Sequence, residues 1–231
     1  MLGTIDAVII GVLAFTGGHF LLSSAPIRDR AVEAIGEEKF RGLYSLVMLG
    51  ALVWLILAYR DAPYLEVWLP SAATKWIPNI LVPLACILLV SGITTRSPTS
   101  VGGEAMLAEP TTFKGILTIT RHPFLWGTGL WSLGHLATNG DLASILLFGA
   151  IAVLSFAGMP ALDAKLRRKV DSAWGPVAMT TSIVPFLAVI QGRTRLDLAG
   201  IGWWRLGLGV LVWVLLYGAH PYYAGVWPHP G

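Results

Sequence analysis

Two histidines and an arginine lie within one apolar stretch of this sequence, TRHPFLWGTGLWSLGHL at residues 120–136. An ionisable side chain inside a bilayer is costly, so such residues persist mainly where they face a cavity, a cofactor or a partner. We therefore expect a functional site on this stretch, built from Arg121, His122 and His135.

The start of the stretch has the features of a helix N-terminus. Thr120 is suited to the N-cap position and Pro123 to the first turn, so we expect the helix to begin at Arg121 or His122. The charge of Arg121 and the free backbone N–H groups of such a helix start suit an anion, such as a carboxylate or a phosphate. His122 is alternatively a simple anchor at the helix start.

The two histidines of the stretch cannot easily bind one metal together. At about 100° and 1.5 Å per residue, His122 and His135 are separated by about 140° around the helix and ~20 Å along it. His135 shares a face with Trp131 and Ser132, at spacings of four and three residues. Glycines such as Gly127 leave room beside this helix for a neighbouring helix or a flat ligand.

Three further histidines lie elsewhere in the chain. His19 follows Gly17 and Gly18 inside an apolar run, where a neutral imidazole needs a hydrogen-bond partner or a metal. His220 lies near the end of the last apolar run and is either an interface anchor or an alternative ligand. His229 is a tail residue with an expected structural or solvated role.

The composition places the chain among integral membrane proteins. It has 231 residues, 55% hydrophobic and 13% charged, whereas soluble domains carry about 25% charged residues. We predict an all-α, polytopic membrane helical bundle that forms a single domain over residues 1–231. The single cysteine, Cys86, lies in an apolar run and is expected to be an inert packing residue. About six spans are predicted, at residues 3–23, 43–59, 77–93, 122–138, 142–162 and 202–222.

The segments between and before these spans give the topology. Residues 182–190 are apolar but too short to span, so we expect them to be interfacial or re-entrant. The first span lacks a basic leader and is interpreted as a retained helix. Lys and Arg gather on alternate loops, with only Arg60 and Lys75 on the opposite side. This bias predicts that both termini lie outside the cytoplasm, and we expect a multi-pass protein of a bacterial inner (cytoplasmic) membrane. The bias also accounts for most of the net charge of +3, so we expect no nucleic-acid partner.

Several segments together resemble one known family. They are GGHFLLSS, IGEEKFRGLYSL, GILTITRHPFLWGTGLWSLGHLATNG, LDAKLRRK, TSIVPFLAVIQGR and AHPYYAGVWP. These resemble the NnrU family, which includes the plant and cyanobacterial 15-cis-zeta-carotene isomerases. For the isomerase branch the resemblance implies haem b held in a membrane bundle by two histidines, with redox state controlling ligation and activity. The bacterial branch is associated with denitrification.

The resemblance also assigns residues. It matches the two axial iron ligands to His19 and His135, and it places Ser132 where the isomerase branch has a cysteine implicated in ligand exchange. By helix rise, His19 lies ~9 Å and His135 ~20 Å from the cytoplasmic ends of their helices, an offset that iron between two imidazoles can bridge. His122 is the rival ligand. Candidate partners for the haem propionates are Arg28, Arg41 and Arg121.

The resulting hypothesis is a haem-b protein that catalyses redox-gated cis–trans isomerisation of a lipophilic polyene. Its expected partners are membrane lipids, that lipophilic small molecule and an electron donor. One alternative is a non-catalytic haem protein for sensing or electron transfer in nitrogen-oxide metabolism. A second alternative is a membrane methyltransferase, because RHP before a helix rich in small residues also resembles the isoprenylcysteine methyltransferases. Those enzymes carry paired glutamates, whereas the comparable region here has one acid, Asp163.

Overall fold

The chain folds into helices. The computed structural model describes residues 2–100, 103–108 and 112–229, and these contain no β-strand beyond an isolated antiparallel bridge between Glu66 and Asp141. The prediction of an all-α fold is confirmed. The α-helices are α1 (Ile5–Val12), α2 (Gly18–Ser23), α3 (Ala25–Ile35), α4 (Glu37–Arg60), α5 (Trp76–Thr94), α6 (Ile116–Ile119), α7 (Pro123–Thr138), α8 (Leu142–Val170), α9 (Trp174–Thr180), α10 (Leu187–Ile190) and α11 (Trp203–Ala224). A π-helix covers Leu13–Gly17, and 3-10 helices cover Gly103–Ala108, Asp171–Ala173 and Ala199–Ile201.

Within the described residues, five helical segments are long and apolar enough to cross a membrane. They are Ile5–Ser23, Glu37–Arg60, Trp76–Thr94, Leu142–Thr180 and Trp203–Ala224. Their outer faces carry large exposed hydrophobic side chains, such as Leu46, Ile93 and Leu215 at 66%, 71% and 62% exposure. Lipid accommodates such faces, whereas water penalises them. The chain is therefore a multi-pass membrane protein, as predicted.

The predicted fourth span forms α7, which is shorter than each of the five spanning segments. Its 16 residues reach about 24 Å, less than the length of the other five. α7 lies against α5 and α8 inside the bundle. Gly127 packs directly against α5, since a Cβ placed there would lie 2.9 Å from the backbone oxygen of Ala85. The expectation that these glycines admit a close neighbouring helix is confirmed.

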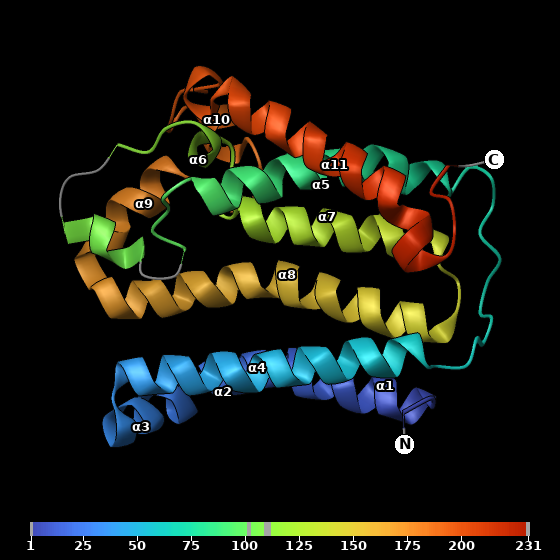
Figure 1. The fold of residues 1–231 in the computed structure, drawn as a ribbon. Helices are drawn as coiled ribbons and strands as arrows, with labels where there is room; N and C mark the ends of the chain where they lie inside the picture. The colour runs from blue at the N-terminus through green and yellow to red at the C-terminus, as the bar shows by residue number, and fades with distance from the viewer. Residues whose placement is uncertain (1, 101–102, 109–111, 230–231) are drawn as a thin grey trace.

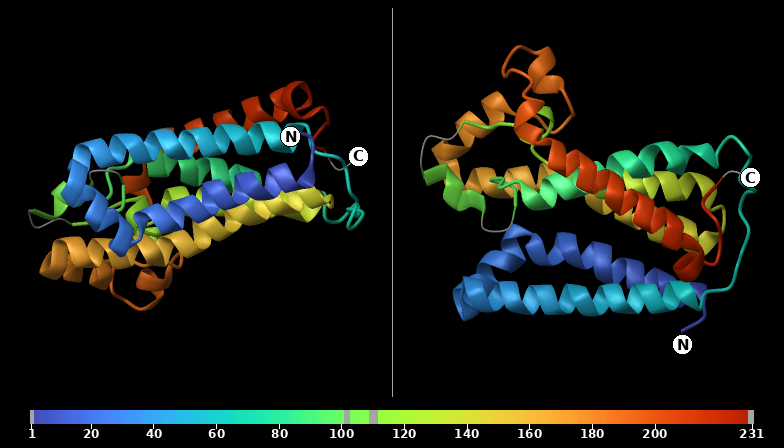
Figure 2. Two further views of the ribbon diagram at one scale, coloured as in Figure 1. Left: turned by 90° about the horizontal axis from the view of Figure 1, so that it is seen from below. Right: turned by 45° about the horizontal axis from the view of Figure 1, so that its top comes forward.

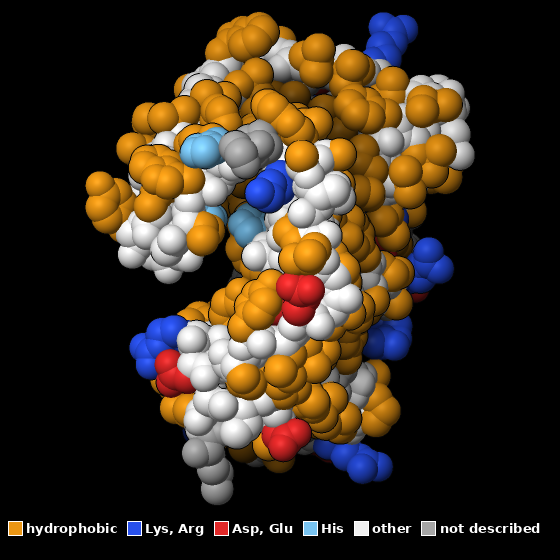
Figure 3. Space-filling view, turned by 90° about the vertical axis from the view of Figure 1, so that its right-hand side faces the viewer, with side chains coloured by type: hydrophobic (Ala, Val, Ile, Leu, Met, Phe, Trp, Pro, Cys, Tyr) orange, Lys and Arg blue, Asp and Glu red, His pale blue; other side chains and the backbone are white. Residues whose placement is uncertain are grey.

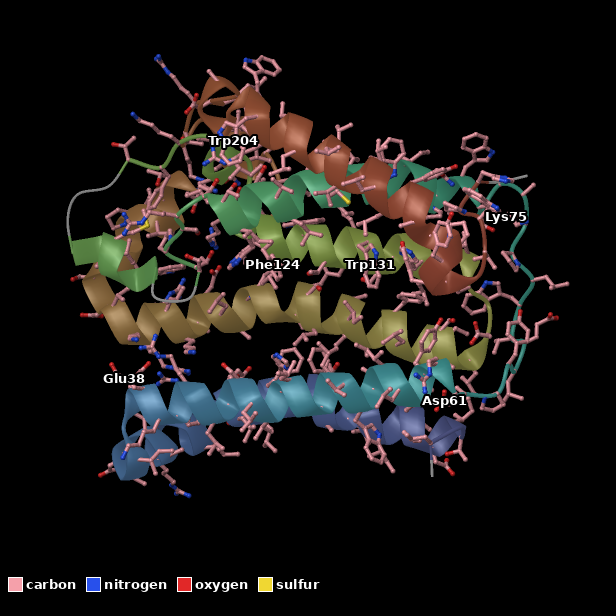
Figure 4. The ribbon with its side chains drawn as sticks, in the orientation of Figure 1. Glu38, Asp61, Lys75, Phe124, Trp131 and Trp204 are labelled. Carbon is pink, nitrogen blue, oxygen red and sulfur yellow. The ribbon has the colours of Figure 1, made fainter. Side chains whose placement is uncertain are left out.

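The bundle helices form three groups, which can be followed in Figures 1 and 2. α4 lies beside α1 and α2, α8 runs through the middle, and α7, α5 and α11 lie on the other side. The start of α1 and the end of α11 lie at the same end of the bundle, together with Asp61 and Lys75 (Figure 4). Glu38 lies at the opposite end. The start of the first helix and the end of the last helix therefore lie on the same side of the bundle, the side that carries few basic residues.

Two buried clusters hold the groups together. We call the first the central cluster, since it joins α1, α4 and α8; its members are Ala7, Val8, Leu55, Ala58, Ala143, Leu147 and Phe148. The second packs the short helices α6 and α9 onto the end of α8. Residues 182–190, predicted not to span, form a turn followed by the four-residue helix α10 at that same end (Figure 1).

Candidate functional site

His19 lies on α2, one turn before the helix ends at Ser23. Its Nδ1–H donates to the backbone oxygen of Phe15 at 2.7 Å. The rings of Phe15 and Tyr44 pack against it edge-on, with centroid distances of 4.6 and 5.7 Å. Because a carbonyl can only accept, this bond puts the proton of a neutral imidazole on Nδ1 and leaves a lone pair on Nε2.

A π-helix over Leu13–Gly17 ends two residues before His19. π-Helical turns are rare in proteins, and those that occur are often found at functional sites. Within this turn Thr16 is only 8% exposed, and its Oγ1 has no hydrogen-bond partner in the described structure. A buried hydroxyl without a partner costs free energy unless a bound group satisfies it. The turn therefore places an unsatisfied donor three residues before His19.

His135 on α7 is held in the same way. Its Nδ1–H donates to the backbone oxygen of Trp131 at 2.8 Å. Its ring lies 4.6 Å from that of Trp131 and 5.1 Å from that of Phe148, measured between centroids. This confirms that His135 and Trp131 share a face. A histidine that ligates a metal typically has its other ring nitrogen oriented by a carbonyl or carboxylate, so His19 and His135 both fit that role.

The two histidines lie at the edges of one apolar region. Their ring neighbours Phe15 and Trp131 both pack against the central cluster, to which Phe148 belongs. No hydrogen bond or ring contact joins His19 to His135 among the described residues. The helices that carry them lie on opposite sides of α8 (Figure 1). The two histidines nevertheless lie at different depths. Tyr44, which packs on His19, and Tyr59, which packs on Phe148 beside His135, are 15 residues apart on α4, or about 22 Å along that helix. The expected offset that one iron could bridge is therefore not seen, and pairing of these histidines would need α2 and α7 to shift.

His122 and Arg121 form a buried network with Asp163 of α8. His122 Nε2–H donates to Asp163 Oδ1 at 2.8 Å. The Arg121 Nε and Nη2 groups donate to Asp163 Oδ2 at 2.9 and 2.5 Å. His122 is 2% exposed, and the side chains of Arg121 and Asp163 are 12% and 11% exposed. A carboxylate of the chain itself therefore occupies the anion-binding groups expected at this helix start, and a ligand would have to displace it.

The prediction of Thr120 as N-cap is wrong, because His122 holds that position. Thr120 is extended instead, with φ −152° and ψ 146°. Its Oγ1 accepts the backbone N–H of His122 at 3.2 Å and donates to the backbone oxygen of Ile183 at 2.8 Å. The next N–H, of Arg121, donates to the backbone oxygen of Ser182 at 3.0 Å. The TRHP motif thus fastens the segment after α9 to the start of α7.

The other predicted cofactor-binding residues have distinct surroundings. The Arg28 guanidinium donates to Glu37 at 2.6 Å. Arg41 is exposed on α4, one turn before Tyr44, and makes no ion pair in the described part of the chain. Ser132 is fully buried and donates to the carbonyl three residues earlier at 2.8 Å. Of these three, only Arg41 makes no hydrogen bond or ion pair among the described residues.

His220 is the remaining candidate near His135. It lies on α11, donates Nδ1–H to the backbone oxygen of Val226 at 2.7 Å, and is close enough to His135 for an electrostatic interaction. Figure 3 views the end of the bundle at which α1 begins and α11 ends. It shows a hollow in the surface, with histidine side chains at its border. His220 therefore stays an alternative partner for His135.

Asp163 joins the network without having been predicted as a site residue. A signal was present, because it is an acid inside a long apolar helix, and such acids normally have a partner. Its partner Arg121 is 42 residues earlier in the sequence. Only the packing of α7 on α8 brings the two together.

Comparison with known proteins gives a family match over most of the chain. The family model for NnrU protein matches residues 7–228. The chloroplastic 15-cis-zeta-carotene isomerase of Arabidopsis thaliana is 27% identical over 195 residues, which cover 81% of this chain and 51% of that protein. The same enzyme of Zea mays is 32% identical over 181 residues, covering 74% and 48%. The chain thus spans about half the length of these relatives. No solved structure matches it significantly.

Proposed function

Because this chain belongs to the NnrU protein family, we propose that it is a membrane haem-b protein that isomerises a lipophilic polyene. The relatives named 15-cis-zeta-carotene isomerase suggest the substrate class. The observation that carries the proposal is the matched orientation of two histidines. His19 and His135 each donate Nδ1–H to the carbonyl of the preceding helical turn, and each keeps Nε2 as a possible iron ligand.

In this proposal His19 and His135 would hold the haem iron through Nε2, which requires their helices to come to one depth. Bound haem would supply an iron whose ligation and reactivity change with its redox state. Arg41 is the best placed propionate partner, because its guanidinium is uncommitted and it lies one turn from Tyr44, which packs on His19. Ser132 does not compete for the iron, since its hydroxyl is already bonded within α7.

The surrounding side chains suit a flat, apolar substrate. Phe15, Tyr44, Trp131 and Phe148 place aromatic rings beside the two histidines. They exclude water from the imidazoles and offer faces against which a conjugated chain can lie. The hollow in Figure 3 offers a route of entry. Thr16 adds a hydroxyl donor that a bound group can satisfy.

The same proposal places the protein in a bacterial inner membrane. The end of the bundle that carries Glu38 (Figure 4) would face the cytoplasm, because most Lys and Arg residues belong to loops at that end. An electron donor would then approach from the cytoplasmic side. Fusion of a reporter to the C-terminus tests this orientation, since alkaline phosphatase is active only outside the cytoplasm.

One observation favours a second function. Ser132 stands where the isomerase branch has a cysteine implicated in ligand exchange, and its hydroxyl is buried and bonded. Without that exchange, a non-catalytic haem protein of nitrogen-oxide metabolism becomes the alternative. Bound haem would then supply a binding site for nitric oxide, and polyenes would stay unchanged.

Absorption spectra of the purified protein test the haem assignment. Wild-type protein should show a Soret band and, after dithionite reduction, sharp α and β bands, with haem b identified as its pyridine haemochrome. His19→Ala and His135→Ala should lose most of this haem while remaining folded. His229→Ala is the matched control, because it removes a tail histidine. Unchanged haem in both site variants would overturn the ligand assignment.

Turnover separates the two functions. The haem-loaded protein, oxidised and reduced, would be incubated with 15-cis-zeta-carotene, and the isomers would be separated by liquid chromatography. Isomerisation by reduced protein only is the expected result. Nitric oxide binding without isomerisation would favour the second function. Absence of haem even after reconstitution would refute both.

A further inference from the structure

A cavity of about 200 Å³ lies between the start of α3 and the end of α8, far from the aromatic rings around His135. Four of its lining residues are cationic, namely Arg28, Lys165, Arg168 and Lys169, and one, Asp29, is acidic. The cations come from two helices that are distant in the sequence. The cavity therefore concentrates positive charge at one point of the fold.

An ion-pair clamp fixes the shape of the cavity. Glu37 at the start of α4 accepts from Arg28 at 2.6 Å and from Lys169 at 3.5 Å. This clamp joins α3, α4 and α8. The Arg28 side chain is 13% exposed, whereas that of Asp29 is 70% exposed, so solvent screens the acid more than the arginine. The four cations outnumber the two nearby acids, Asp29 and Glu37, so the charge at the cavity favours an anion.

The cavity lies at the depth of lipid headgroups. The membrane-spanning segment Ile5–Ser23 ends at Ser23, which lines the cavity. On α8, Lys165 follows the start of the helix at Leu142 by a length of about 35 Å, slightly more than the thickness of the hydrocarbon layer. Leu21, two residues before Ser23, which lines the cavity, is 58% exposed. The basic cavity thus adjoins an apolar surface.

We propose that this cavity binds a phosphate ester, supplied by the headgroup of an anionic phospholipid. Arginine and lysine side chains converging on one point match the charge and the hydrogen-bond acceptors of a phosphate. The exposed apolar surface at the end of the first span lies beside it and suits the acyl chains. Free phosphate offers the same anion without acyl chains, and the test distinguishes these two sources.

Two neighbouring arginines on α8 provide a matched pair of variants. Both are exposed, but Arg168 lines the cavity, whereas Arg167 lies about 100° away around the helix and does not. Purified full-length Arg168→Gln, Arg167→Gln and wild-type protein would be titrated with dioctanoyl phosphatidylglycerol, dioctanoyl phosphatidylcholine and sodium phosphate, with complexes counted by native mass spectrometry. Each variant loses one charge, so any difference between them reports the cavity.

We expect wild-type protein to bind phosphatidylglycerol in preference to phosphatidylcholine. Arg168→Gln should weaken this binding about fivefold, the effect of ~1 kcal/mol per basic residue near a membrane surface, and Arg167→Gln should not. Competition by millimolar phosphate would identify free phosphate as a sufficient ligand, and no competition would identify the lipid. Equal losses in both variants, or equal binding of both lipids, would overturn the proposal. Haem content measured on the same samples should stay constant, so the result is independent of the proposed function.

Discussion

Replacing Asp163 by Asn removes one negative charge from the interior while keeping the shape of the side chain. Asp163 accepts hydrogen bonds from both His122 and Arg121. The variant leaves the Arg121 guanidinium, 12% exposed, without its counter-ion. Removing one partner of a buried ion pair costs about 3–5 kcal/mol. Trp174 lies 5.8 Å below the guanidinium and retains some stabilisation, so we expect a loss near the lower figure.

A double-mutant cycle isolates the interaction from the loss of either side chain. Arg121→Met alone leaves the Asp163 carboxylate with only His122, and it should also destabilise the protein. The double variant removes both charges, so its destabilisation should be smaller than the sum of the single effects by roughly 1–3 kcal/mol. Asp61→Asn is the control, because Asp61 pairs with Arg60 at 2.8 Å on the surface, where a pair contributes about 0–1 kcal/mol.

The single cysteine provides the assay. Cys86 is 2% exposed, so a thiol-reactive fluorescent dye labels it only as the protein unfolds during heating in detergent. A loss of about 3 kcal/mol should lower the Tm of Asp163→Asn by roughly 6–12 °C, with little change for Asp61→Asn. Equal Tm values for these two variants, or strict additivity in the cycle, would refute the account of a charge-paired network.

Two further variants test helix packing and a loop carboxylate. Gly127→Ala would place a Cβ 2.9 Å from the backbone oxygen of Ala85 and should cost about 1–3 kcal/mol by the Cys86 dye assay; Gly149→Ala meets nothing and should be neutral or slightly stabilising. The N–H groups of Gly115 and a second glycine lower the pKa of Asp197, so its stabilisation is present above an unfolded pKa of about 3.9 and is lost as pH falls through the folded pKa. Asp197→Asn should therefore lower Tm at neutral pH, with a difference from wild type that shrinks below about pH 4. A constant difference across pH would contradict this.

The membrane class and the positions of the helices are readable from the sequence because their causes are local. A bilayer requires about 20 consecutive apolar residues, and Pro123 marks a helix start wherever the rest of the chain lies. The length of α7 is less predictable. Thr120 is drawn into an extended conformation by a carbonyl of Ile183, so the helix starts later than its apolar run suggests.

The candidate site is only partly predictable from the sequence, because its geometry depends on contacts between segments that are distant in the chain. Arg121 and His122 are conspicuous in an apolar stretch, but the acid that neutralises Arg121 comes from α8. The direction of His19 is also hidden, because counting 100° per residue fails across the π-helix over Leu13–Gly17. That π-helix shifts every later residue around the axis relative to a straight α-helix. Long-range packing and irregular turns thus separate a list of candidate residues from a site.

The two proposed ligands, His19 and His135, share a local hydrogen-bond arrangement that His220 lacks. An aromatic residue stands four positions before each of them, Phe15 before His19 and Trp131 before His135. In both pairs the aromatic residue supplies the carbonyl that accepts Nδ1–H, and its ring lies 4.6 Å from the imidazole. His220 instead donates to a carbonyl six residues after it, outside α11. A bond within a helical turn fixes an imidazole against a rigid element, whereas a bond to a loop lets it move with that loop. This arrangement gives His19 and His135 the same local orientation, whereas His220 is the histidine within electrostatic range of His135.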